Sequence, residues 1–246
     1  MTVLLLAALI PPIFLVIKIY QMDKIEKEPV GLIVRLLIFG ALTCIPAAFI
    51  ETFGERIISS FLPQGSMLYY LVEAFLVVAW AEEGVKHFVL KRLTWRHPAF
   101  DYHFDAVVYA TAASLGFAAL ENVMYVMGVG SVSEGLSVAA SRGLLSIPGH
   151  CIFGIFMGIY YGKAKHEELS GNIARAKSMM RLSMVVPVLL HGFYDFCLFT
   201  QNGFLSASSW YLLLFWTLSH SAPSASIPER IRCFRRYASS IFIVMT

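Results

Sequence analysis

The sequence predicts an all-α fold, a polytopic bundle of about seven helices that cross a lipid bilayer. Of the 246 residues, 58% are hydrophobic and only 14% are charged. A soluble domain is typically about 25% charged, and a helix needs about 20 apolar residues to cross the hydrocarbon core. Apolar runs near that length recur along the chain. They are continuous rather than alternating, which excludes a β-barrel.

The apolar runs mark seven expected spans, at 3–20, 31–50, 67–90, 105–128, 141–162, 182–201 and 205–220. We expect residues 1–220 to form a single transmembrane domain. Residues 221–246 are expected to be a divergent basic tail, because their closing apolar run is too short to cross a membrane. The polar stretch at 163–181 is expected to be a short amphipathic connector.

Basic residues predict the orientation of the chain. Lysine and arginine gather in the connections that follow the first, third and fifth spans, and again in the tail. The second and fourth connections hold one arginine each, Arg56 and Arg142, and the sixth holds none. Basic loops stay in the cytoplasm. The N-terminus is therefore expected outside and the C-terminus in the cytoplasm.

Ionisable or strongly polar side chains interrupt four consecutive spans. An ionisable group at the bilayer centre costs about 2.5–3.5 kcal/mol. Any single one could be explained by an interhelical hydrogen bond, but such groups in four neighbouring spans indicate one shared, wet cavity. These residues are Glu73, Glu82, Glu83, Lys86, His87, Glu121, Asn122, His150, His191 and Asp195.

Helical spacing in the third span predicts pairs of opposite charge. Glu82 precedes Lys86 by four residues and Glu83 precedes His87 by four, so each carboxylate has a possible partner one turn later. The two glutamates point about 100° apart and can line one polar face. Glu73 has no partner at helical spacing and is interpreted as a packing or hydrogen-bonding residue.

The next three spans indicate which polar groups face protein. The segment SIPGHCIFGIFMGIYYG (146–162) places His150 and three glycines at four-residue intervals. Small residues at that spacing let a second helix approach closely, so His150 is expected to face protein with them. Glu121 lies beside a face of small residues and is also expected to be buried. Asp195 follows His191 by four residues, which suits a carboxylate that orients an imidazole, although a purely structural pair is equally compatible.

Several intramembrane mechanisms lack their sequence motifs. The chain has no H-E-x-x-H, no G-x-S-x-G and no GxGD motif. Three residues after Glu83 comes Lys86, which excludes the Glu-x-x-His pattern of di-iron sites. Paired glutamates, a third glutamate and two histidines remain. Such a set can activate water by general-base catalysis and stabilise an oxyanion, with or without a metal.

Four short motifs, one in each of four consecutive spans, resemble a known family. EEGVK (82–86) matches EExxK, FAALEN (117–122) matches FxxxEN, HCIFG (150–154) matches HxxxG, and HGFYD (191–195) places aspartate four residues after histidine. This set resembles the PrsW family of bacterial membrane proteases, distant relatives of the CAAX prenyl protease and bacteriocin-processing superfamily. The resemblance covers roughly residues 1–215.

The resemblance implies a multi-pass protease of the bacterial plasma membrane. Such a protease makes the first (site-1) cut in a single-pass, membrane-anchored anti-sigma factor, on its extracytoplasmic side, after envelope stress. The implied roles are a water-activating base (Glu82 or Glu83), a lysine that tunes it (Lys86), a polar wall (Glu121, Asn122), histidines that assist the water or the oxyanion (His150, His191) and an orienting carboxylate (Asp195).

The resemblance leaves the cofactor open, because the family has been regarded both as metal-dependent and as metal-free. Three glutamates and two histidines would satisfy a Zn²⁺ ion chemically. The residues that could bind it are Glu82, Glu83, Glu121, His150 and His191.

Two other functions stay open at this point. Intramembrane glutamate, histidine and aspartate also form proton relays, as in a proton-coupled transporter. Against a transporter, the chain shows no internal repeat and is short for that class. A catalytically inert, protease-like binding protein is the other alternative. No nucleic-acid partner is expected.

Overall fold

The computed structural model describes residues 1–23 and 27–200, and within these ranges it is helical with no strand. This confirms the all-α prediction. The seventh expected span, 205–220, and the expected tail at 221–246 lie outside the described residues. The helices are α1 (Thr2–Met22), α2 (Val30–Leu42), α3 (Cys44–Phe61), α4 (Met67–Val72), the π-helix η1 (Glu73–Val78), α5 (Ala79–Thr94), α6 (His103–Met127), α7 (Val132–Leu144), α8 (Ser146–Leu169) and α9 (Ile173–Phe199).

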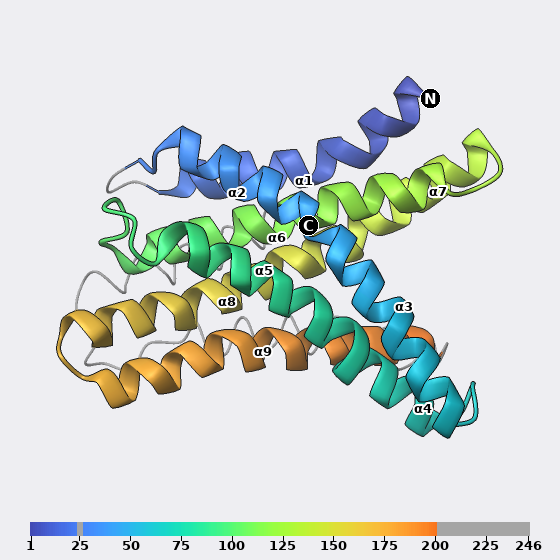
Figure 1. Cartoon of the computed structure of the whole chain (residues 1–246). Helices are drawn as coiled ribbons and strands as arrows, with labels where there is room; N and C mark the ends of the chain where they lie inside the picture. Colours follow the sequence, from blue (N-terminus) through green and yellow to red (C-terminus); the bar gives the residue numbers. More distant parts are fainter. Residues whose placement is uncertain (24–26, 201–246) are drawn as a thin grey trace, which may run out of the picture.

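Helix α6 is the central helix of the bundle (Figure 1). It packs against α1, α2 and α8, and α8 in turn packs against α9. The main core cluster includes most of the residues of α6 between 106 and 118. The connections α1–α2, α5–α6 and α8–α9 lie at one end of the bundle, whereas the N-terminus and the α3–α4 and α6–α7 connections lie at the other (Figure 1).

Membrane-spanning length is confirmed for five segments in the described part of the chain. Each is long and apolar enough to cross a bilayer: 2–22, 30–61, 103–127, 132–169 and 173–199. The fourth expected span, 105–128, matches α6 closely. The third expected span, 67–90, corresponds to α4, η1 and α5, a continuous helical segment that carries several charged residues.

Two expected spans are broken into pairs of helices. The break between α2 and α3 falls at Thr43, and the break between α7 and α8 falls at Leu145. In both cases a proline, Pro46 or Pro148, occupies the third position of the new helix. Proline is tolerated in the first turn, where its missing N–H would have no helical partner. Pro46 and Pro148 therefore each fit a new helix start, whereas Pro11, Pro12 and Pro187 lie inside α1 and α9.

The predicted length of the connector at 163–181 is wrong. Helix α8 continues to Leu169, α9 begins at Ile173, and the turn between them contains Gly171 at φ 80°. Polar sequence outside the bilayer does not end a helix, so hydropathy alone placed the end of α8 too early and the start of α9 too late. Likewise, α3 continues to Phe61, well beyond the expected limit at residue 50.

The glycines of α8 allow two helix backbones to touch, as predicted from their spacing. A Cβ added at Gly158 would lie 2.5 Å from the Cα of Val107, and one at Gly162 would lie 2.8 Å from the His103 carbonyl oxygen. The Ser114 hydroxyl of α6 also donates to the His150 carbonyl oxygen at 2.7 Å. This contact fixes the height of His150 relative to α6.

The π-helix η1 lies between α3 and α9. A Cβ at Gly192 of α9 would lie 2.6 Å from Cδ1 of Phe75, and one at Gly54 of α3 would lie 2.7 Å from Cγ1 of Val77. These close approaches hold the π-helix between two neighbours. The glutamate pair lies one turn after it, near the middle of the helical segment 67–94.

A buried carboxylate joins the α1–α2 connection to α6. The Tyr109 hydroxyl donates to the Glu28 carboxylate, and the Tyr20 hydroxyl donates to the Glu28 main-chain oxygen at 3.1 Å. Burial raises the pKa of Glu28 to about 8; the nearby Asp105 carboxylate raises it further, while the Tyr109 bond opposes the shift. The packing of the α1–α2 connection against α6 is therefore most stable when the Glu28 carboxyl group is protonated.

We expect Gly158→Ala to lower the free energy of unfolding by about 1–3 kcal/mol, the usual cost of overpacking. The added methyl group would meet backbone that cannot move without separating α6 from α8. Thermal unfolding in detergent measures the effect. Gly31→Ala is the matched control, because nothing lies within 4 Å of a Cβ at Gly31. Equal melting temperatures for the two variants would contradict the close packing of α6 and α8.

The raised pKa of Glu28 predicts a pH-dependent stability. Its pKa of about 8 in the folded protein lies above the ordinary carboxyl pKa of 4.5. The stability contribution is therefore complete below about pH 4.5 and is lost as pH rises through 8, by up to about 1.4 kcal/mol per pH unit. Glu28→Gln should flatten this decline in melting temperature between pH 5 and 8. Glu134→Gln, at an exposed position, should leave it unchanged; a decline of equal slope in all three proteins would refute the assignment.

Candidate active site

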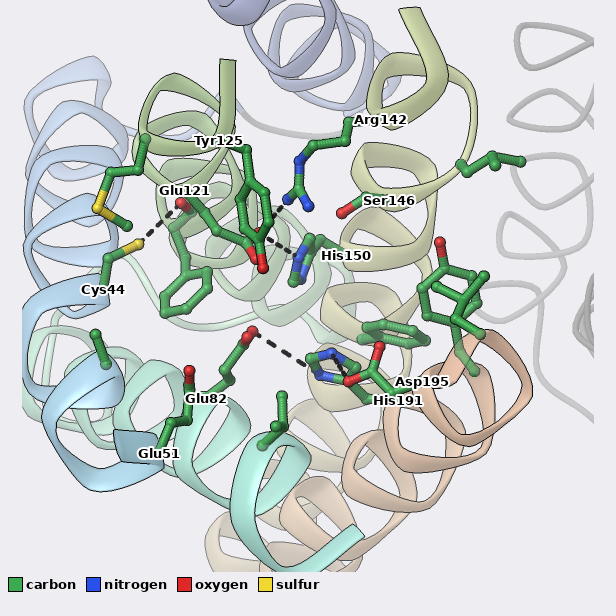
Figure 2. A pocket seen from close by; sticks show the side chains of 18 of the residues that line it. Cys44, Glu51, Glu82, Glu121, Tyr125, Arg142, Ser146, His150, His191 and Asp195 are labelled. Atoms are coloured by element: carbon green, nitrogen blue, oxygen red, sulfur yellow. Dashed lines mark hydrogen bonds and ion pairs between the residues drawn. The ribbon is translucent and has the colours of Figure 1, made fainter. Parts of the chain in front are cut away.

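A cavity of about 460 Å³ lies at the end of the bundle where α6 and α9 finish (Figure 2). Its wall includes Met124 and Tyr125 from the last turn of α6 and Phe199 from the last residue of α9. Further wall residues come from α3, η1, α5, α7 and α8. Among the sequence-predicted site residues, five line the cavity: Glu82, Glu121, His150, His191 and Asp195.

The Lys86 ammonium group lies at the centre of the polar cluster and is fully buried. Its Nζ is 2.8 Å from Glu82 Oε2, 2.8 Å from Glu83 Oε1 and 3.2 Å from His150 Nδ1. An ammonium group has three hydrogens to donate, so all three are used. The Phe117 ring packs against the same nitrogen, with its centroid 4.0 Å away. Sequence spacing predicted the bond to Glu82 but not the other contacts.

Glu83 is completely buried and connects Lys86 to α9. Its Oε1 lies 2.9 Å from His191 Nδ1, and His191 Nε2 lies 3.2 Å from Asp195 Oδ2. The His191 ring is therefore held between two carboxylates, one at each ring nitrogen. The expected contact of Asp195 with His191 is present. The second oxygen of Glu83, Oε2, is buried without a hydrogen-bond partner in the described part of the chain.

His150 connects Lys86 to α6 and α7. Lys86 can only donate, so His150 Nδ1 accepts, and the ring proton lies on Nε2, which donates to Glu121 Oε2 at 3.0 Å. The same Glu121 oxygen accepts from Arg142 Nη2 at 2.6 Å. Arg142 was not predicted as a site residue, although it is the one arginine of its connection. Figure 2 shows it above His150.

Three other polar residues of these spans lie away from the cavity wall. Asn122 is buried behind Glu121; it donates to the Ala8 carbonyl oxygen at 2.8 Å and accepts from Arg142 Nε at 3.1 Å. The predicted pairing of His87 with Glu83 is wrong: His87 Nε2 instead lies 2.8 Å from Ser183 Oγ. Glu83 instead bonds to Lys86, three residues later on the same helix. Glu73 begins η1 and is also absent from the cavity wall.

Comparison with known proteins identifies the family. Residues 28–220 match the model of the PrsW family intramembrane metalloprotease. The chain belongs to the PrsW protease family. It is 36% identical to Protease PrsW of Oceanobacillus iheyensis, over 88% of this chain and 92% of that protein. It is 34% identical to Protease PrsW of Bacillus subtilis, over 85% and 89% respectively. No solved structure matches it.

Membership of the PrsW family confirms the predicted resemblance and makes this chain a multi-pass membrane protease. The apolar helices of the bundle agree with that class. The four motifs that suggested the family come together in space through Lys86, His150 and His191. The transporter alternative loses its support, because the relatives of this chain are named as proteases.

The family description as a metalloprotease raises the question of a metal site. Glu82, Glu83 and His150 offer ligand atoms that lie within 4.8 Å of one another. Two carboxylates and an imidazole suit Zn²⁺. The Oε2 atom of Glu83, which makes no hydrogen bond in the described part of the chain, could serve as a metal ligand. The residues therefore fit a divalent cation. Lys86 binds the same three side chains, so a metal and the ammonium group would compete for them.

The three contacts of the buried Lys86 ammonium group predict that this residue is required for folding as well as for activity. Lys86→Met should lower the free energy of unfolding by about 3–5 kcal/mol, because it leaves two buried carboxylates without their cation. The double variant Lys86→Met/Glu83→Gln should recover part of that loss. Thermal unfolding in detergent measures both.

The matched control for this experiment is Lys91→Met, at an exposed position on the same helix. If Lys86→Met unfolds at the same temperature as Lys91→Met, the three contacts of the buried ammonium group do not stabilise the protein.

Proposed function

We propose that this PrsW-family protease makes the first, site-1 cut in a single-pass membrane protein, an anti-sigma factor of envelope-stress signalling. The proposed reaction is peptide hydrolysis by water that Glu82 and the site histidines activate. One observation carries the assignment. Glu82 lines the cavity, and its Oε2 atom is bonded to the buried Lys86. Its carboxylate is therefore fixed beside a space that a peptide would enter.

The proposed site of cleavage is extracytoplasmic. The end of the bundle that holds the α1–α2, α5–α6 and α8–α9 connections is the basic one, which favours the cytoplasm. The cavity lies toward the opposite end, near the last turns of α6 and α9. With the N-terminus outside and the C-terminus in the cytoplasm of a bacterial cell, the cavity would open toward the outer half of the plasma membrane.

Glu82 is the better candidate for the general base of the pair. It lines the cavity, whereas Glu83 is fully enclosed and bonded to both Lys86 and His191. Glu82 would take a proton from water as the oxygen attacks the scissile carbonyl carbon. It would then return that proton to the nitrogen of the leaving amine as the C–N bond breaks. Proton transfer by one positioned group typically contributes 10²–10⁴-fold to the rate.

The remaining polar groups would orient the reactants and stabilise negative charge. His191 lies at the cavity wall, and Glu83 and Asp195 hold its ring in place. Arg142 has further N–H donors beside those bound to Glu121 and Asn122. Donors already fixed in a site with little water stabilise the developing oxyanion most effectively. Lys86 would position the Glu82 side chain through its bond at 2.8 Å.

A divalent metal, if bound, would be held by Glu82, Glu83 and His150 and would supply Lewis acidity to the water. In that case Lys86 would move away from the same three side chains. Glu121 and His191, also predicted as ligands, lie outside this group of three. Their side chains would instead orient His150 and Glu83.

The proposal predicts that at least one of Glu82→Gln and Glu83→Gln folds normally and loses cleavage by 10²–10⁴-fold. An amide keeps the shape and hydrogen bonds of the side chain but takes no proton from water. The measurement is cleavage of a purified single-pass anti-sigma factor by the full chain in liposomes. Parallel reactions with a chelator, followed by added Zn²⁺, report whether a metal takes part.

Glu73→Gln, which changes a carboxylate outside the cavity wall, is the control and should retain most of the activity. Full cleavage by both Glu82→Gln and Glu83→Gln would remove the catalytic assignment. An inert wild-type protein, with every variant equally inactive, would instead favour the protease-like binding protein.

A further inference from the structure

Glu51 lies on the cavity wall, although neither the sequence motifs nor the proposed reaction uses it. It belongs to a narrow inward-facing stripe of α3, Cys44, Ala48 and Glu51, spaced at four and three residues. The rest of this helix exposes large apolar side chains such as Phe49 and Phe53, as expected for a lipid-facing surface. A carboxylate therefore occupies the one face of α3 that meets the cavity.

The Glu51 carboxylate has no cation of its own among the residues that the structure describes. Its Oε1 is buried and makes no hydrogen bond there. The charges that act on it most strongly are two other carboxylates, Glu82 and Glu121. A carboxylate with one buried, unpartnered oxygen is costly, although Glu51 as a whole is only partly buried. This arrangement is understandable if the partner arrives from outside the chain.

The cations at the cavity are already engaged elsewhere. Lys86 binds Glu82 and Glu83, and Arg142 binds Glu121 at 2.6 Å. His191 is held between Glu83 and Asp195. Each of these three side chains contacts at least one carboxylate, and none of them forms an ion pair with Glu51. The basic groups described at the cavity are therefore engaged with other carboxylates than Glu51.

The position of Glu51 relative to the reacting groups suits a substrate contact. Figure 2 shows Glu51 and Arg142 on opposite sides of Glu82 and His150. A cavity of about 460 Å³ falls within the size range of ligand sites. A peptide segment that places its scissile bond beside Glu82 would bring a neighbouring side chain to Glu51.

We propose that Glu51 is a specificity-determining residue that binds a lysine or arginine side chain of the substrate, next to the bond that is cut. This inference rests on the proposed peptide hydrolysis and adds a substrate class to it. A hydrogen bond to a charged partner is worth about ten- to a hundredfold in binding. The contact would also neutralise the substrate's cation within the bundle, where a free charge is disfavoured.

The test is a positional scan of cleavage in liposomes. The probe is a single-pass substrate whose residues around the cut are changed, one position at a time, to lysine, glutamine or glutamate. Wild-type enzyme should prefer lysine over glutamate at one position by at least tenfold in kcat/KM. Glu51→Gln should reduce that ratio to near one, and Glu51→Lys should reverse it. Ratios at the other positions should change by less than threefold.

Glu55 supplies the matched control. It lies one turn further along α3, is exposed, and does not line the cavity, so Glu55→Lys makes the same charge change without altering the contact. A lysine preference that persists in Glu51→Lys would overturn the proposal. So would a reversal that Glu55→Lys produces equally, because it would reflect the general charge of the surface.

Failure of the proposed function gives a different result. If wild-type protein cuts no member of the panel, the same substrates are compared for binding to the full chain by photo-crosslinking. Capture of the lysine substrate in preference to the glutamate substrate, lost in Glu51→Gln but kept in Glu55→Gln, would retain the Glu51 assignment without hydrolysis. Equal capture of both substrates would reject it.

Discussion

The buried ammonium group of Lys86 is the constraint on which the rest of the site depends. It bonds to two side chains of its own helix and one of α8. From these partners the contacts continue through His191 to α9, and through Glu121 to α6 and Arg142 of α7. Buried charges are tolerated only when their partners are complete. The network therefore favours one register of these helices over all others.

Helix packing makes this network possible. The glycines of α8 bring its backbone against α6, and the Ser114 hydroxyl sets the height of His150 on that surface. His150 can then reach Glu121 and Lys86 at the same time. Larger residues at the glycine positions would separate α8 from α6 by more than a hydrogen bond can bridge. The chemistry of the site is thus encoded partly in residues that carry no polar side chain.

The sequence predicted the parts of the structure that depend on one helix at a time. Hydropathy located α1 and α6 to within two residues, and helical spacing predicted the bonds of Lys86 to Glu82 and of His191 to Asp195. It did not predict the helix breaks at Thr43 and Leu145, because a hydropathy window sums side chains and does not detect a backbone turn. The prolines three residues later, Pro46 and Pro148, were the available signal.

Contacts between helices were outside the reach of spacing arguments. Glu83 had two possible partners on its own helix, and only the position of α9 explains why it turns to Lys86 and His191 rather than to His87. Glu51 and Arg142 were missed for a simpler reason. Glu51 follows the expected end of the second span directly, and Arg142 was counted with a connection, so neither was treated as an intramembrane residue.

The π-helix at Glu73–Val78 bears on how this chain can vary in length. A π-helix closes its hydrogen bonds over one more residue than an α-helix does, and one residue corresponds to a rotation of about 100°. Deleting one residue within η1 would replace the π-helical turn by an ordinary α-helical turn. The segments before and after it could then keep their present faces toward α3 and α9. By contrast, a one-residue deletion in the α-helical stretch between η1 and Glu82 would turn the glutamates away from the cavity.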